Sequence, residues 1–293
     1  MSTVDVVVVS HNSGRTLRGC VDTLCHEEGV GVIVVDNASA DESLASIGDL
    51  PVDAVPLDTN LGFAHGCNTG WRRGAGDYVL LLNPDARIDV ASVRRLAQVL
   101  EESRDTGIAG PRIVDENGAL ERSIRRFPRL ASTYAQAIFL HRLRPEAEWT
   151  DEVVRASARY ESASLADWLS GACLLVRRSF LESAGGLDEG FFMYCEDKDL
   201  CRRAWDAGLA VRYEPHAVAV HLGGGGASGA RADLLPVLAR SRMRYARKHS
   251  GRWAALAERG GIALGSLTHA VLGRRPDVRR GHARALAATL SGT

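Results

Sequence analysis

Three carboxylates lie within four positions in the second half of the chain, directly after a run of mostly aromatic residues. The run covers residues 191–195, and the carboxylates are Glu196, Asp197 and Asp199. Acidic clusters are usually solvated, but apolar neighbours place a carboxylate at the wall of a pocket, where it can take a proton from a substrate. We predict that Asp197 is a general base, with Glu196 as the alternative, and that Asp199 caps a helix over residues 199–207.

A second acidic site follows an apolar strand in the first half of the chain. Asn83-Pro84-Asp85 comes directly after the predicted strand Tyr78–Leu82. Open α/β sheets bind their ligands at the carboxyl ends of their strands. Two acidic sites, one at a strand end and one at a helix start, predict an enzyme that uses a metal ion and a base.

Apolar strands alternate with helices over the first 115 residues. This alternation predicts an α/β fold in which helices cover both faces of a mostly parallel sheet. The predicted strands are 4–9, 32–35, 52–57, 78–82 and 107–114, and the predicted helices are 16–25, 41–47, 63–73 and 90–101.

The pattern is less regular after residue 115. Residues 122–159 are rich in Arg and Pro and predict an irregular excursion near a binding face. We predict a catalytic domain over 1–230, with a nucleotide-binding half at 1–115 and an acceptor-binding half at 116–230, and a helical extension over 231–293. The remaining predicted elements are strands at 168–176, 209–213 and 217–221, and helices at 178–184, 231–249, 252–273 and 277–290.

The charge of the chain is unevenly distributed, although its net value is zero. Residues 231–293 carry 13 Arg and Lys against 3 Asp and Glu, whereas residues 1–230 carry 23 against 33. The basic helices either pack on the core or on a second subunit of a homodimer, or dock peripherally on an anionic membrane. A nucleic-acid partner is not expected, because the basic helices join an acidic body and lack an RNA-stacking pattern.

The cysteines and the apolar runs indicate the compartment. The six cysteines form no C-x-x-C pair and have no His cluster beside them, which argues against a zinc site. The chain enters a strand at once, which leaves no room for a signal peptide, and no run reaches the length of a spanning helix. We therefore expect buried or free thiols in the cytoplasm, with the inner face of the plasma membrane as the place of any membrane contact.

Several motifs, taken together and in this order, resemble the inverting glycosyltransferases of family 2. The resemblance covers roughly residues 3–250, is closest to the rhamnosyltransferase branch, and implies the GT-A fold. It implies transfer of a sugar, L-rhamnose from a dTDP donor, to a hydroxyl of a glycan, glycolipid or small glycoside. The motifs are V-V-V-S-H-N-S near the start, V-V-D-N-A-S-A-D-E-S at 34–43, N-L-G-F-A-H-G-C-N-T-G at 60–70, L-L-N-P-D-A at 81–86, W-L-S-G-A-C-L-L-V-R-R at 168–178, G-G-L-D-E-G-F-F-M-Y-C-E-D-K-D-L at 185–200 and H-L-G-G-G-G at 221–226.

The resemblance assigns the donor site to the ends of the first strands. Asp36 would hold the base or ribose, and the alternative is that it caps the next helix. Glycine in the turn before the third helix lets the backbone approach a phosphate. The other nucleotide-sugar candidates are Ser10, His11, Asn60, Gly62, Phe63 and Asn83.

The resemblance also implies a divalent cation, Mg²⁺ or Mn²⁺. Asp85 stands at the end of the family's D-x-D motif, and His221 would complete the coordination shell. The first position of that motif is Asn83 here, so the motif supplies one anionic ligand. Residues 223–231 would form a lid over the donor, with Ser228 or Arg231 reaching the diphosphate.

The acceptor site follows from the same motifs. The family pattern assigns the base to Asp197 and leaves Glu196 to orient the acceptor. Trp168 would stack on a sugar ring or belong to the core, and Ser170 and Gly171 lie beside it.

Two other classes share parts of this pattern. Sugar nucleotidyltransferases also combine α/β sheets with acidic metal sites, but they usually carry a glycine-rich basic loop after the first strand, which residues 10–14 do not resemble. A non-catalytic nucleotide-sugar-binding module would not need a carboxylate in the aromatic pocket.

Overall fold

The computed structural model describes residues 2–223 and 232–291. The chain divides into two compact units. Unit 1 comprises Met1–Ile124, Ser157–Gly190 and Glu196–Gly224, and unit 2 comprises Arg125–Ala156, Phe191–Cys195 and Gly225–Thr293. The excursion after residue 124 therefore belongs with the C-terminal helices, and the predicted boundary at residue 230 lies outside the described residues.

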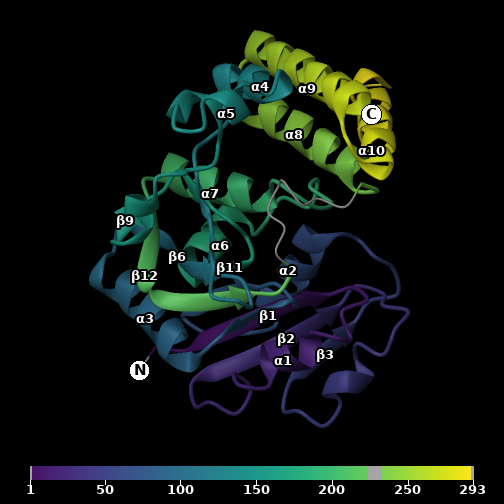
Figure 1. Ribbon diagram of the computed structural model, residues 1–293. Helices are drawn as coiled ribbons and strands as arrows, with labels where there is room; N and C mark the ends of the chain where they lie inside the picture. Colours follow the sequence, from purple (N-terminus) through teal and green to yellow (C-terminus); the bar gives the residue numbers. More distant parts are fainter. Residues whose placement is uncertain (1, 224–231, 292–293) are drawn as a thin grey trace. The chain divides into compact units, whose positions relative to one another are not determined.

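Unit 1 is built on a mixed, mostly parallel sheet, as predicted (Figure 1). Its strands follow the order β3-β2-β1-β4-β11-β6-β12-β5, with β7 beside β6 and β9 beside β12. β1, β2, β3 and β4 run parallel, whereas β11 is antiparallel to both β4 and β6. The strands are β1 (Val4–Ser10), β2 (Val30–Asp36), β3 (Asp53–Pro56), β4 (Tyr78–Leu82), β5 (Ala86–Ile88), β6 (Thr106–Val114), β7 (Leu120–Glu121), β9 (Ser164–Leu165), β11 (Cys173–Arg177) and β12 (Ala210–His221), while β8 (Ile124–Arg125) and β10 (Trp168–Leu169) lie outside this sheet.

The helices of unit 1 connect these strands. Two predicted helices are shorter than expected: residues 16–25 form only α1, and residues 41–47 form only the 3-10 turn η1. In the segment 41–47 the Asp41 side chain accepts from the Ser43 N–H and the Ser46 hydroxyl donates to the Ser43 carbonyl, and such side chains compete with the backbone for hydrogen bonds. The helices are α1 (Leu17–Val21), η1 (Ala45–Ile47), α2 (Phe63–Trp71), α3 (Val90–Glu102), η3 (Ser157–Tyr160), α6 (Arg178–Ala184) and α7 (Glu196–Asp206).

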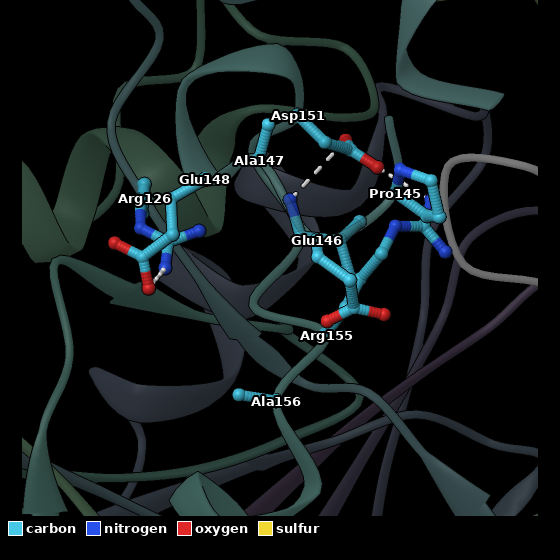
Figure 2. A pocket seen from close by; sticks show the side chains of 9 residues that line it. Arg126, Pro145, Glu146, Ala147, Glu148, Asp151, Arg155 and Ala156 are labelled. Atoms are coloured by element: carbon cyan, nitrogen blue, oxygen red, sulfur yellow. Dashed lines mark hydrogen bonds and ion pairs between the residues drawn. The ribbon is translucent and has the colours of Figure 1, made fainter. Parts of the chain in front are cut away.

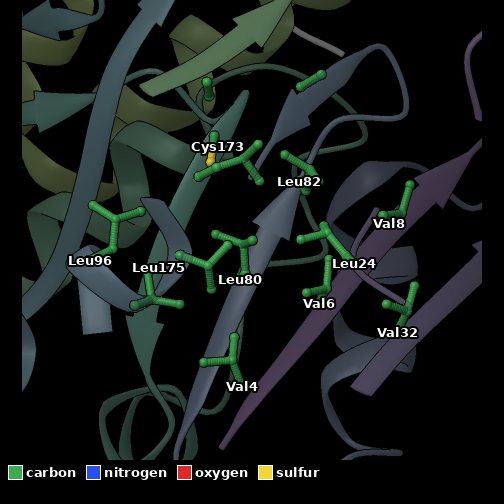
Figure 3. Packing of buried hydrophobic residues seen from close by; sticks show 14 of the residues in the cluster. Val4, Val6, Val8, Leu24, Val32, Leu80, Leu82, Leu96, Cys173 and Leu175 are labelled. Carbon is green, nitrogen blue, oxygen red and sulfur yellow. The ribbon is translucent and has the colours of Figure 1, made fainter. Parts of the chain in front are cut away.

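The central strands are buried on both faces. Every residue of β1 and of β4 is buried, and side chains of β1, β4 and β11 pack against α3 in one cluster (Figure 3). Such strands carry β-branched and aliphatic residues without alternation. Leu80, at the centre of this cluster, is fully buried, and its truncation to alanine would cost about 2–5 kcal/mol.

Two predicted strands differ from the observed ones. The predicted strand 168–176 is interrupted at residues 170–172 and forms β10 and β11. The predicted strands 209–213 and 217–221 are one strand, β12, whose register on β6 shifts between Glu214 and Val218. A β-bulge bends a strand without ending it, and the Pro215-His216 pair lies at that bulge.

Unit 2 is helical, and the excursion 125–156 forms part of it. α4 packs on α9 through a hydrogen bond of 2.5 Å from Thr133 to Glu258. α8, α9 and α10 pack around Ala239, Met243, Ile262 and Ala285. No helix in the described ranges is both long and apolar enough to cross a membrane. The helices are α4 (Leu130–Ala137), α5 (Leu140–Leu143), η2 (Glu148–Thr150), α8 (Leu235–His249), α9 (Arg252–Leu272) and α10 (Pro276–Ser291).

The cysteines agree with the expectation from the sequence. All six are free and buried, and the set is Cys20, Cys25, Cys67, Cys173, Cys195 and Cys201. Burial raises the pKa of the Cys201 and Cys173 thiols, which disfavours the nucleophilic thiolate.

A buried ion pair ties the start of β1 to α6. The carboxylate of Asp5 pairs with the guanidinium of Arg178, accepts the Gly76 N–H at 2.7 Å, and is largely shielded from solvent. Arg178 also donates to the carbonyl of Trp71 at 3.0 Å.

We predict that Asp5→Ala lowers the free energy of unfolding by about 3–5 kcal/mol, because it leaves the Arg178 guanidinium buried without its partner. Urea denaturation, monitored by circular dichroism, measures this change in the free energy of unfolding. Asp49→Ala is the control, since Asp49 pairs with Arg18 on the exposed surface and its loss should leave the midpoint unchanged. Equal midpoints for Asp5→Ala and the wild type would contradict the prediction.

Candidate active site

Helix α7 begins three residues earlier than the sequence indicated. Its first turn contains Glu196, Asp197 and Asp199, where carboxylates are favourable to the helix dipole. Asp199 is therefore not a cap. Its side chain is fully buried and accepts a hydrogen bond of 2.9 Å from Arg203, one turn further on. The preceding residues Tyr194 and Cys195 have positive φ angles of 69° and 68°, so the chain enters the helix through left-handed backbone that a sequence pattern does not reveal.

Asp197 is held by two backbone N–H groups. Its Oδ2 accepts from Gly171 at 2.9 Å, and its Oδ1 accepts from Lys198 at 2.7 Å. A Cβ at residue 171 would lie 3.0 Å from the Asp197 Cβ, so glycine permits this close approach. A carboxylate held in this way can accept a proton in a fixed orientation.

Glu196 lies in a drier environment than its neighbour. It is 7% exposed, and its Oε2 is buried without a hydrogen-bond partner among the described residues. Burial, followed by repulsion from Asp197, raises the pKa of Glu196 well above its ordinary value. The raised pKa favours the protonated form of Glu196, which can donate a hydrogen bond and is a poor base.

The turn Asn83-Pro84-Asp85 joins β4 to β5. The Asn83 N–H donates to the carbonyl of Ala172 at 3.0 Å, which continues the antiparallel pairing of Leu82 with Cys173. The Asn83 carbonyl accepts the Ala86 N–H at 3.0 Å, which closes a tight turn. This turn leaves the Asp85 side chain one-third exposed at the end of the sheet.

His221 ends β12 beside Asp85. Its Nε2 lies 3.3 Å from Asp85 Oδ1, and its Nδ1 lies 2.9 Å from Glu121 Oε2. Burial alone would lower the pKa of His221, but hydrogen bonds and charges from Asp85 and Glu121 raise it to about 9. The Leu222 N–H donates to the Asp85 carbonyl at 2.8 Å, and a Cβ at Gly223 would collide with the Asp85 carboxylate.

These two side chains fit a divalent cation in part. Asp85 offers a hard oxygen and His221 an imidazole nitrogen, and the two atoms lie 3.3 Å apart. In the part of the chain that the structure describes, no three or more His, Cys, Asp or Glu side chains surround a common metal position. Mg²⁺ and Mn²⁺ commonly take one or two protein ligands and fill the remaining positions with substrate phosphate and water. The site therefore suits a cation that arrives with a diphosphate.

The first two strands form the other side of the site. Ser10 and Asp36 end β1 and β2 as register partners, and the Ser10 hydroxyl is buried without a hydrogen-bond partner among the described residues. Asp36 accepts from the Ser39 N–H at 3.0 Å and from its hydroxyl at 2.5 Å. His11 Nδ1 lies 2.9 Å from the Asn37 carbonyl oxygen, and its ring is exposed. Asp36 thus stabilises a turn and retains lone pairs for a ligand.

Asn37 links this strand end to the loop before α2. Its side chain donates to the Gly62 carbonyl at 3.1 Å and accepts from the Leu61 N–H at 3.0 Å. Asn60 accepts from the Gly62 N–H at 3.0 Å, and Gly62 has a φ of 94°, which favours glycine. Phe63 then begins α2. The sequence did not single out Asn37, although it lies next to Asp36 at the strand end.

Trp168, Ser170 and Gly171 lie in and after β10. Trp168 is buried, and the Lys198 ammonium is 4.8 Å from the centre of its ring. That contact favours a packing role for this ring over stacking on a sugar. Ser170 donates its N–H to the Ser123 carbonyl at 3.1 Å, which fixes the segment that reaches Asp197.

The sheet brings most of the predicted residues to one edge. β1, β2, β4, β6 and β12 end there, and β11 begins there, because it is antiparallel to its neighbours. The segment Gly171-Ala172 connects the turn that holds Asp85 to Asp197. The Asn83 N–H donates to the Ala172 carbonyl, and the Gly171 N–H donates to the Asp197 carboxylate. All predicted site residues belong to unit 1. The predicted lid over 223–231, with Ser228 and Arg231, lies outside the described residues from residue 224 onward.

A small cavity elsewhere is unrelated to this edge (Figure 2). It lies in unit 2, has a volume of about 30 Å³, and contains the ion pairs Arg126–Glu148 and Arg155–Asp151, each at 2.5 Å. Two of the carboxylates that line it are thus already paired with arginines.

The fold and this edge define a glycosyltransferase with the GT-A fold. A mannosyltransferase from Pyrobaculum calidifontis, in complex with GDP-Man and Mn²⁺, superposes with a TM-score of 0.59 at 16% identity over 99% of this chain and 87% of its own. GalNAc-T7 with UDP, GalNAc and Mn²⁺ superposes with a TM-score of 0.61 at 15% identity over 99% of this chain and 56% of its own.

The chain belongs to glycosyl transferase family 2, whose model matches residues 5–158. It is 33% identical to N-acetylglucosaminyl-diphospho-decaprenol L-rhamnosyltransferase of Mycobacterium tuberculosis H37Rv, over 96% of both chains. It is 31% identical to rhamnosyltransferase WbbL of Escherichia coli K12, over 74% of this chain and 83% of that relative. The predicted family and its rhamnosyltransferase-like branch are confirmed.

We predict that Glu196→Gln stabilises the protein increasingly as pH rises. Between the ordinary pKa of about 4.5 and the raised pKa of the folded state, Glu196 is protonated in the folded protein and ionised in the unfolded chain. The free energy of unfolding of the wild type therefore falls as pH rises through this range. Glutamine carries no proton to lose. Urea unfolding at about pH 5 and about pH 8 measures the difference between variant and wild type. A difference that does not change with pH would contradict the prediction.

Proposed function

We propose that this glycosyltransferase moves L-rhamnose from dTDP-rhamnose, with inversion, to a hydroxyl of a glycan or lipid-linked acceptor. The orientation of Asp197 at the end of the sheet, one backbone segment from the Asn83–Asp85 turn, carries the proposal. The names of the relatives support rhamnose as the sugar, and one of those names specifies a decaprenol-linked acceptor.

The proposed roles follow the order of the strand ends. Asp36, with Ser10 and His11, holds the nucleoside, and the loop of Asn60, Gly62 and Phe63 faces the phosphates. Asp85 and His221 hold the cation, beside Asn83. A bound Mg²⁺ or Mn²⁺ would offset the negative charge that grows on the diphosphate leaving group. Because the Asp85 side chain is partly exposed, it can face both the ion and solvent.

The acceptor hydroxyl attacks the anomeric carbon from the face opposite the diphosphate. A new carbon–oxygen bond forms as the bond from the anomeric carbon to the phosphate oxygen breaks, and Asp197 takes the hydroxyl proton. Gly171 and Lys198 N–H groups keep the carboxylate oriented for this transfer. The protonated form of Glu196, which its raised pKa favours, would donate a hydrogen bond that orients the acceptor. Ser170 and Gly171 lie in the segment that contacts Asp197.

We predict that Asp197→Asn lowers kcat by about 10²–10⁴-fold, because the amide cannot accept the proton. Release of dTDP from dTDP-rhamnose with Mn²⁺ and an acceptor measures the rate. Asp206→Asn is the control on the same helix, since Asp206 pairs with Arg202 on the exposed face. Full activity of Asp197→Asn would refute the assignment of the base. Pyrophosphate release would indicate nucleotidyl transfer instead, and nucleotide binding without turnover would indicate a binding module.

An exposed apolar stripe on α9 supports a membrane-bound acceptor. Four exposed apolar side chains recur along α9 at helical spacing: Trp253, Leu256, Leu267 and Val271. The exposed fraction of Trp253 is 74%. Arginines occur in the sequence at both ends of this helix, at residue 252 and at residues 274 and 275. Apolar side chains flanked by cationic ones bind anionic lipid surfaces. We propose that unit 2 binds peripherally to the inner face of the plasma membrane.

We predict that the wild type sediments with phosphatidylglycerol vesicles and that the triple variant W253A/L256A/L267A does not, because the stripe can no longer insert. Leu165→Ala, an exposed leucine of unit 1, is the control and should bind as the wild type does. Absence of wild-type binding would contradict the proposal. A dimer that the triple variant abolishes, seen by light scattering, would assign the stripe to a second subunit.

A further inference from the structure

Glu121 is brought to His221 by a short hairpin. β6 and β7 are joined by a turn in which Asp115 accepts from the N–H groups of Asn117 and Ala119, at 2.9 and 2.8 Å. Gly118 has a φ of 79°, which closes the turn. The turn therefore fixes the register in which Glu121 pairs with Ile113.

That register places Glu121 and His221 on one face of the sheet. Glu121 pairs with Ile113 of β6, and Ile113 pairs with Ala219 of β12. His221 lies two residues beyond Ala219, and side chains two apart share a face. The two side chains thus meet diagonally across β6, although they are 100 positions apart in the sequence.

The contact between them has a defined direction. The Glu121 side chain is 15% exposed, and its Oε2 lies 2.9 Å from His221 Nδ1. An ionised carboxylate only accepts hydrogen bonds, so Nδ1 must carry the proton and donate. Nε2, on the opposite side of the ring, then faces Asp85. The ring is held in the orientation that turns Nε2 toward Asp85, and a cation bound there would displace the proton from Nε2.

We propose that Glu121 is a positioning residue that holds His221 ready to bind the divalent cation. This inference rests on the proposed cation site at Asp85 and His221. Carboxylates that accept from the second nitrogen of a metal-binding histidine fix its orientation and raise its basicity, and their loss typically costs 10–100-fold in metal affinity. Glu121 contacts neither donor nor acceptor in this role and acts only through the imidazole.

Binding of Mn²⁺ alone, and of Mn²⁺ with dTDP, tests the proposal by electron paramagnetic resonance of the free ion. Glu121→Ala should weaken Mn²⁺ binding about 10–100-fold. Glu121→Gln should lose less, because the amide oxygen still accepts the Nδ1–H. Raising the Mn²⁺ concentration should restore the activity of Glu121→Ala by mass action. Glu116→Ala, an exposed carboxyl in the same hairpin turn, is the matched control, and thermal melting verifies that each variant is folded.

Two failures have different meanings. If His221→Ala loses Mn²⁺ binding while Glu121→Ala and Glu121→Gln bind as the wild type does, the role of Glu121 is wrong and the cation site stands. If His221→Ala and Asp85→Asn both bind Mn²⁺ as the wild type does, the proposed cation site itself is wrong. If Glu121→Ala does not fold, Glu121→Gln decides the question: wild-type affinity together with wild-type Mn²⁺ dependence of activity overturns the proposal.

Discussion

The antiparallel pairing of β11 with β4 is the constraint on which the rest of the site depends. Leu82 pairs with Cys173, and the pairing continues outward as the Asn83 N–H bonds the Ala172 carbonyl. One residue further on, Gly171 bonds Asp197. A strand that ran parallel to β4 would start at the opposite edge and carry this segment away. The reversed strand therefore fixes the first turn of α7 against the end of β4.

The same edge gives its two neighbouring carboxyl groups, Asp197 and Glu196, different environments. Asp197 accepts two backbone hydrogen bonds, whereas the neighbouring Glu196 has a buried oxygen with no partner among the described residues and a raised pKa. In the proposed mechanism these different surroundings suit the adjacent carboxyl groups to different tasks, Asp197 to accept a proton and Glu196 to donate a hydrogen bond. Around His221, two carboxylates face opposite ring nitrogens. The His221 ring is thus paired with a carboxylate at each of its two nitrogens.

Much of the fold could be predicted from the sequence, because buried parallel strands are written as unbroken apolar runs. Tyr78–Leu82 and α6 were predicted to the residue. The direction of β11 could not be predicted, since a strand buried on both faces reads alike in either direction. The segment 122–159 was read as irregular because its Arg and Pro obscure the short helix α4, which is stabilised by packing on α9.

The residues of the candidate site were likewise predicted only in part. Asp85 and Asp197 stood out because each follows an apolar segment and because the motifs around them resemble a known family. Glu121 was missed, since it lies in a strand of only two residues and its contact depends on the β6–β7 register. Asp199 was misread as a cap because positive φ angles at Tyr194 and Cys195 let α7 begin earlier. Local pattern carries no information on contacts made across the sheet.

The central claim is that the cation and the base act on opposite sides of one reacting bond. A crystal structure with Mn²⁺ and dTDP, with anomalous data at the manganese edge, tests it most directly. The account predicts a single anomalous peak between Asp85 and His221 Nε2, with the diphosphate on the ion and Asp197 facing the vacant sugar position. A peak at any other place, or a nucleotide bound where Asp197 cannot reach the sugar, would contradict it.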